Sequence, residues 1–82
     1  MRYEFTDDAI ILSPLLSKVV LQKEEITGVS MPTDYAPANG ILVGSIQYGM
    51  DAVMIHTNRG NFYFYTGTPQ AFMKKAQDFF TV

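Results

Sequence analysis

His56 is the side chain in this sequence best suited to act as a base, because it is the single histidine among 82 residues that include no cysteine. Nucleophilic catalysis needs a hydroxyl or thiol beside a base that a third group orients. Such a triad is conceivable only if folding brings Ser30 or Ser45, together with an aspartate, to His56. Because His56 stands in a predicted strand beside apolar residues, we interpret it as a histidine that its neighbours partly cover.

Two other patterns suggest chemistry at first sight. Asp7 and Asp8 could be paired carboxylates for acid and base work, but adjacent residues point in different directions and aspartate is common in turns. The run from Gly40 to Gly44 lacks the lysine and the strand-to-helix context of a phosphate-binding loop. One histidine without cysteines makes no metal motif, and the acidic residues lack the spacing of a carboxylate site. The sequence therefore predicts no catalysis, no metal and no cofactor.

The charge balance excludes further classes of function. Six basic and eight acidic side chains give a net charge of −2, the wrong sign for a surface that neutralises nucleic-acid phosphates. No apolar run approaches the roughly 20 residues that cross a bilayer. The start at Met1 lacks the apolar region of a signal peptide, and the absence of cysteine fits a reducing compartment. We expect a soluble cytoplasmic protein that binds no nucleic acid.

The elements that position these residues are mostly strands. The pattern predicts one mainly β domain over residues 1–82, in which residues 31–39, with two prolines, form a surface loop. The segment Glu24–Ser30 fits either a bulged strand or a helical turn that runs into a strand, and we favour a strand. The predicted strands are Tyr3–Phe5, Ile10–Leu12, Lys18–Gln22, Glu24–Ser30, Ile41–Tyr48, Ala52–Thr57 and Asn61–Thr66.

One helix begins at Thr68 and closes the chain. The Thr68 hydroxyl can cap the helix, and Pro69 falls at the first helical position, where its missing N–H costs nothing. Downstream, apolar residues recur at helical spacing on one face, which predicts that this face packs on the sheet. The face consists of Phe72, Met73, Ala76, Phe79 and Phe80.

No crossover helix separates the strands, so parallel βαβ units are excluded. A small closed or nearly closed antiparallel barrel, or two orthogonal sheets with the helix over one opening, hides the strand edges most simply.

The sequence resembles the bacterial pleckstrin-homology-like (PH-like) domains. The resemblance lies in the runs Tyr3–Asp8, Glu25–Val29, Val53–Tyr63 and Thr68–Phe72. The resemblance implies a barrel of about seven antiparallel strands capped by the helix, with the stretch Pro37–Asp51 shorter than in longer members.

PH-like folds serve lipid binding, peptide binding and assembly, so the resemblance implies no single function. Members that bind phosphoinositides hold the head group with basic side chains around the loop between the first two strands. That loop here is Thr6–Ala9, whose two carboxylates repel phosphate. Arg2, Lys18 and Lys23 are too few and too dispersed to replace the missing charge. We therefore expect no phosphoinositide binding.

Four consecutive aromatic residues, Phe62 to Tyr65, place two large rings on each face of one strand. The segment Asn58–Gly60 suits a three-residue loop that pairs Thr57 with Asn61. That register puts Tyr63 and Tyr65 on the core side, although tyrosine hydroxyls favour the reverse arrangement, and we favour the first on turn geometry. The first register leaves an outer apolar stripe consisting of Met54, His56, Phe62 and Phe64.

An exposed apolar stripe usually marks contact with another chain, unless the N-terminal segment or the long loop covers it. Our first hypothesis is therefore a non-catalytic module for protein interaction or self-assembly, with the stripe as its interface and a second copy as one partner. The alternative is a small domain that binds a peptide or an apolar ligand near the 31–39 loop and the C-terminal helix.

Overall fold

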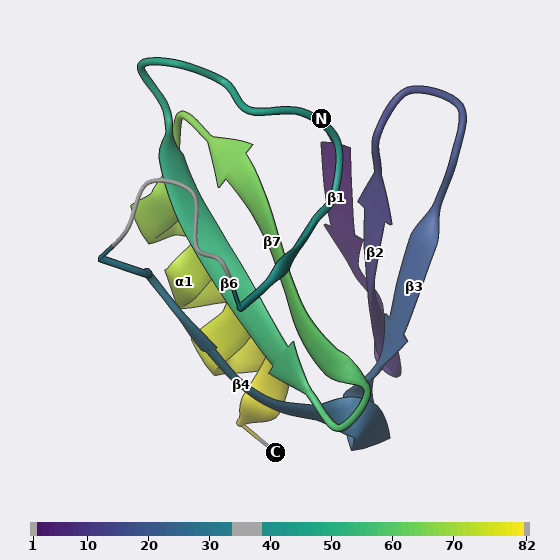
Figure 1. Cartoon of the computed structure of the whole chain (residues 1–82). Coiled ribbons are helices and arrows are strands. Elements are labelled where there is room, and N and C mark those ends of the chain that lie inside the picture. The colour runs from purple at the N-terminus through teal and green to yellow at the C-terminus, as the bar shows by residue number, and fades with distance from the viewer. Residues whose placement is uncertain (1, 34–38, 82) are drawn as a thin grey trace.

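The computed structural model describes residues 2–33 and 39–81. Within these ranges the chain forms seven strands, one short 3₁₀ helix and one α-helix (Figure 1). The elements are β1 Arg2–Phe5, β2 Ala9–Ser13, β3 Val19–Gln22, η1 Lys23–Glu25, β4 Ile26–Ser30, β5 Ile41–Leu42, β6 Asp51–Thr57, β7 Gly60–Thr66 and α1 Pro69–Phe80. The expected mainly β architecture with a C-terminal helix is confirmed.

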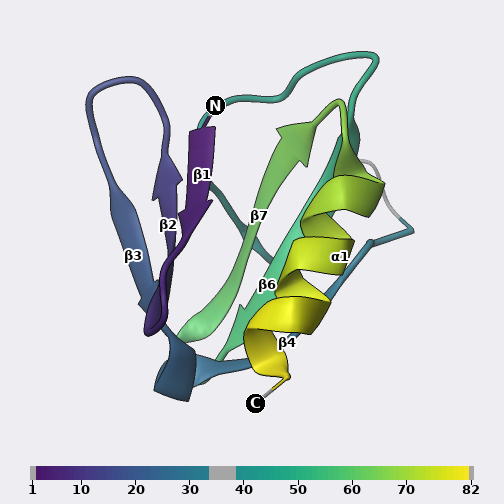
Figure 2. The same ribbon diagram turned by 180° about the vertical axis from the view of Figure 1, so that it is seen from behind.

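The strands form two separate sheets. One has the order β1-β2-β3, and the other has the order β4-β6-β7-β5. All neighbours are antiparallel except β5 and β7, which run parallel. The sheets do not close into a barrel, so the closed and fully antiparallel form of the prediction is wrong. The second sheet instead continues from the first through η1, as Figures 1 and 2 show.

The strand predicted over residues 41–48 extends only over Ile41–Leu42, and this short strand pairs in parallel with β7. Gly44 and Gly49 have φ angles of 89° and 86°, a region that favours glycine and interrupts an extended run. The chain after Val43 therefore leaves the sheet and returns to it at Asp51.

The segment predicted as a strand over 24–30 contains both a helical turn and a bulged strand. The helical turn is η1, which precedes β4, and the bulge is the shift of register between Ile26 and Gly28.

Helix α1 starts as predicted, with Thr68 at the N-cap and Pro69 at the first helical position. The expected cap by the Thr68 hydroxyl is wrong, because this side chain makes no capping hydrogen bond. The Thr68 N–H donates instead to Thr66 Oγ1 at 3.1 Å. Phe72 and Ala76 are fully buried, while Met73, Phe79 and Phe80 pack on the core edge. The predicted apolar face is confirmed.

The main core lies where α1 and the first sheet meet the inner face of the second sheet (Figure 2). The Phe72 ring contacts Tyr3, Phe5 and Phe64, with ring centroids 5.0 to 5.2 Å apart. Such edge and tilted contacts add stability beyond the burial of apolar area. The helix thereby ties β1 to β7, which lie in different sheets.

The β6–β7 hairpin has a two-residue loop, Asn58-Arg59, because Thr57 pairs with Gly60. The three-residue loop predicted from the turn sequence is wrong by one residue. Gly60 enters the ladder with a φ of 124°. The Thr57 hydroxyl donates to the Gly60 carbonyl at 2.6 Å and accepts the Arg59 N–H at 3.0 Å, which closes the shorter turn.

Candidate functional site

The one-residue change of register reverses the two faces of β7 and breaks up the predicted interface. Phe62 and Phe64 lie on the core side with Val53 and Ile55, and Phe64 is completely buried. Met54 and His56 lie on the opposite face, where Met54 is 2% exposed. The expectation that Met54, His56, Phe62 and Phe64 form one outer stripe is therefore wrong. A buried Phe64 or Met54 offers no contact surface to a partner.

The outer face of β6 and β7 is itself covered. Ala52, Met54, Tyr63 and Tyr65 form a second buried cluster against which Leu42 packs. A Cβ atom at Gly40 would lie 2.7 Å from Tyr63 Cδ1, so the backbone of this glycine rests directly on the ring. The segment Gly40–Leu42, which follows the long loop, thus covers this face, whereas the alternative to partner contact had named the N-terminal segment or the long loop. The loop itself, predicted over 31–39, lies outside the described residues at positions 34–38.

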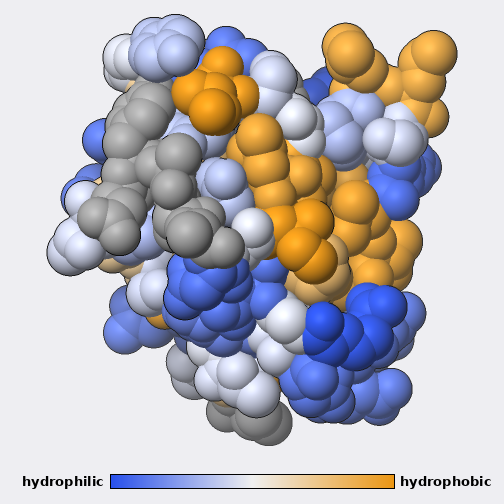
Figure 3. Space-filling view, in the orientation of Figure 1, coloured by the Kyte–Doolittle hydropathy of each residue, from blue (hydrophilic) through white to orange (hydrophobic). Residues whose placement is uncertain are grey.

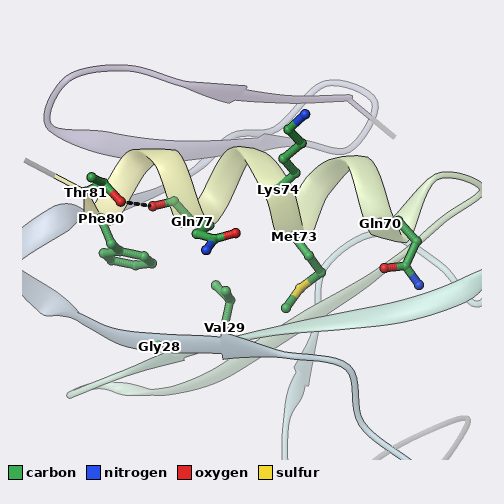
Figure 4. Close-up of a pocket in the computed structure, with 8 residues that line it drawn as sticks. All are labelled: Gly28, Val29, Gln70, Met73, Lys74, Gln77, Phe80 and Thr81. Carbon is green, nitrogen blue, oxygen red and sulfur yellow. Dashed lines mark hydrogen bonds between the residues drawn. The ribbon is translucent and has the colours of Figure 1, made fainter.

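A groove runs between α1 and β4 and encloses about 690 Å³ (Figure 4). Val29 points from β4 toward the helix, and Met73 and Phe80 point from the helix toward β4. Gln77 lies between the two apolar side chains of the helix, so amide and apolar groups alternate along the groove. Its other lining residues are Gly28, Gln70, Lys74 and Thr81.

The strand that forms one wall of this groove is the edge of its sheet. β4 pairs with β6 on one side and has no strand on the other among the described residues. An edge strand presents backbone N–H and C=O groups that another extended chain can pair with. The groove therefore combines free backbone partners on β4 with apolar contacts on α1. The pattern of the helix predicted its inward face, but which strand would lie at the edge depends on long-range pairing.

His56 takes part in a chain of hydrogen bonds on the outer face. Its Nε2 atom lies 2.7 Å from Ser30 Oγ, and its Nδ1 atom lies 3.0 Å from Asn61 Oδ1. All three side chains are half-buried. Ser30 was one of the two serines considered as a partner of His56. The third group is an asparagine on β7 and not the expected aspartate, so Asn61 was missed.

A second hollow of about 1000 Å³ lies beside the β2–β3 connection. Leu15 and Leu16 line it and are fully exposed, and Val43 and Tyr65, both buried, also line it. Figure 3 shows apolar side chains projecting over the β2–β3 hairpin at the upper right of the molecule. Leu15 has a φ of 48°, a conformation that costs a leucine about 1–2 kcal/mol. An exposed apolar pair held in strained backbone is typical of a contact site.

The remaining candidates have structural roles. Asp7 and Asp8 lie in a turn where the Thr6 N–H donates to the Ala9 carbonyl at 2.9 Å, as predicted. In residues 2–33 and 39–81, no three His, Asp or Glu side chains gather into a group that could hold a metal ion. Nor does that part of the chain contain a helix whose length and apolar character would allow it to span a membrane.

Comparisons with known proteins yield no match to a family model, to a curated protein or to a solved structure.

Proposed function

We propose that this chain is a protein-interaction domain that binds an extended peptide in the groove between β4 and α1. The observation that carries the proposal is the position of an unpaired sheet edge beside an apolar helix face. In this binding mode the main chain of the peptide supplies hydrogen bonds and alternate side chains enter pockets. Val29, Met73 and Phe80 would receive the side chains that face inward.

The chemistry of the groove indicates the kind of peptide. The apolar side chains of Val29, Met73 and Phe80 favour a short peptide with β-branched or aromatic residues. The amides of Gln70 and Gln77 can donate to and accept from the peptide's polar groups. We therefore expect an extended ligand with an apolar residue at every second position.

The two-sheet architecture with a C-terminal helix also supports, in outline, a relationship to PH-like domains, which we retain as part of the proposal. The open arrangement of the sheets and the parallel β5–β7 pair depart from that pattern. We keep the cytoplasm as the proposed compartment because the chain has no cysteine.

The test is selection of peptides from a random library on the immobilised domain, followed by amide chemical-shift mapping with the selected sequences. We expect shifts concentrated in residues 26–30 and 70–81. Met73→Gln should weaken binding about tenfold, because it replaces apolar contact in the groove with an amide. Met50→Gln is the matched control, since Met50 is 39% exposed and lies outside the groove. Selected peptides that bind Met73→Gln as tightly as the wild type would overturn the proposal.

Self-association is a second candidate function, and the exposed Leu15 and Leu16 favour it. These side chains line a hollow that also contains Val43 and Tyr65, so projecting and receiving surfaces lie side by side on one molecule. A two-fold interface requires such a self-complementary patch, because each copy must present both surfaces to the other.

A further inference from the structure

The Ser30–His56–Asn61 chain joins three strands of one sheet and has a defined direction. Ser30 lies on β4, His56 on β6 and Asn61 on β7. The two hydrogen bonds of 2.7 and 3.0 Å use both nitrogens of the imidazole. A hydroxyl beside a base that a third group orients is the arrangement that activates serine nucleophiles.

The orientation of Asn61 fixes the proton on His56. Asn61 Nδ2 donates to the Asn39 carbonyl at 3.4 Å, which leaves Oδ1 facing the imidazole. Since Oδ1 only accepts, the Nδ1 atom of neutral His56 must carry the hydrogen. The Nε2 lone pair then accepts the hydrogen of the Ser30 hydroxyl. This tautomer is the one in which His56 can remove a proton from Ser30.

There is open space beside this pair. Gly28 pairs with His56 across the strands, and Ser30 lies two residues further along β4, so both positions face the same side. A Cβ atom at Gly28 would meet no other atom within 4 Å. A small flat group can therefore approach Ser30 over Gly28. This side is opposite to the side chain of Val29, which points toward the α1 groove.

We propose that Ser30 is an acylation site, a nucleophilic serine that accepts an acyl group from an activated ester or thioester. Ser30 Oγ attacks the carbonyl carbon while His56 Nε2 takes the hydroxyl proton. The carbon–leaving-group bond breaks, the alkoxide or thiolate leaves with that electron pair, and the proton on Nε2 passes to it. The products are an ester on Ser30 and a free alcohol or thiol. Asn61 acts as a positioning residue, because its Oδ1 bonds to the imidazole of His56 and its Nδ2 to the Asn39 carbonyl, at the end of the chain away from Ser30.

The experiment uses p-nitrophenyl acetate as the acyl donor, with release of p-nitrophenolate and peptide mapping by mass spectrometry as readouts. We expect one acetyl group on Ser30 in the wild-type chain. Ser17, whose exposed hydroxyl donates to the Pro14 carbonyl, is an internal control and should stay at the background level. His56→Gln should slow acetylation of Ser30 about 100-fold or more, since it removes the base.

Asn61→Ala should acetylate Ser30 at a rate between those of the wild type and His56→Gln. Asn61→Asp should acetylate Ser30 faster than Asn61→Ala, because a carboxylate oxygen also accepts the Nδ1 hydrogen. Circular dichroism of each variant shows whether it folds. If a variant does not fold, the ratio of Ser30 to Ser17 acetylation in the wild type still decides the question. Equal acetylation of the two serines, or an undiminished rate in folded His56→Gln, would overturn the proposal.

Discussion

Gly40 shows how one residue without a side chain allows the outer face of the second sheet to be covered. Its backbone lies against the Tyr63 ring and the end of Met54, at distances that leave no room for a Cβ. Tyr63 and Met54 are themselves buried, so neither can move freely into solvent. A larger residue at position 40 must therefore displace the covering segment or the ring.

We expect Gly40→Ala to lower the free energy of unfolding by about 1–3 kcal/mol, the usual cost of overpacking. The measurement is urea denaturation followed by circular dichroism. Gly67→Ala is the matched control, because a Cβ there would meet no atom within 4 Å and its φ is not positive. The control should change stability by no more than about 0.5 kcal/mol. Equal effects of the two substitutions would contradict the close contact at Gly40.

At the scale of single residues, the sequence predicted local turn chemistry better than contacts between distant residues. The turn roles of Asp7 and Asp8 follow from local chemistry and are confirmed. The assignment of Phe64 to the surface was wrong because a shift of one residue in strand pairing reverses both faces. That shift depends on Gly60 joining the ladder, and in the strand itself only the preference of tyrosine hydroxyls for the outer face favoured it.

At the scale of elements, α1 was the most predictable part, since its apolar spacing and its proline act locally. Its first turn differs from the expectation because no side chain caps it, and the Thr66 hydroxyl on β7 accepts only the N–H of Thr68, before the first helical residue. The predicted length of β5 was too great, because the positive φ angle of Gly44 interrupts the apolar run that begins at Ile41. Edge positions such as that of β4 are set by pairing over long sequence separations, which residue propensity does not encode.

The turn between β7 and α1 predicts unequal effects of two threonine substitutions. Thr66→Val removes the acceptor of the Thr68 N–H and should cost about 1 kcal/mol of stability. Thr68→Val should cost clearly less, since the Thr68 hydroxyl makes no capping bond to the helix. Valine keeps the β-branched shape in both variants. Thermal unfolding by calorimetry provides the comparison, and a larger loss in Thr68→Val would show that the hydroxyl of Thr68 does cap the helix.

At the scale of the whole molecule, the two sheets stay open at the end that carries the β2–β3 connection. The hollow beside Leu15 and Leu16 lies there, and Val43 and Tyr65 also line it. The sequence favoured a closed barrel because closure hides strand edges. The structure instead covers one sheet face with residues 40–43 and leaves apolar side chains exposed at the opening.

This opening predicts concentration-dependent self-association. Burial of Leu15 and Leu16 in a second copy removes apolar area from water, whereas the isolated molecule leaves both side chains fully exposed. In size-exclusion chromatography with light scattering, the apparent mass of the wild type should rise toward that of a dimer as the protein concentration increases. The double substitution Leu15→Ser/Leu16→Ser should remain a monomer and keep its stability within about 0.5 kcal/mol, because neither residue belongs to the core.

Ile41→Ser is the control, since Ile41 is 55% exposed and does not line the hollow. A wild-type chain that stays monomeric at every concentration would rule out association through this surface and leave the β4–α1 groove as the proposed contact site.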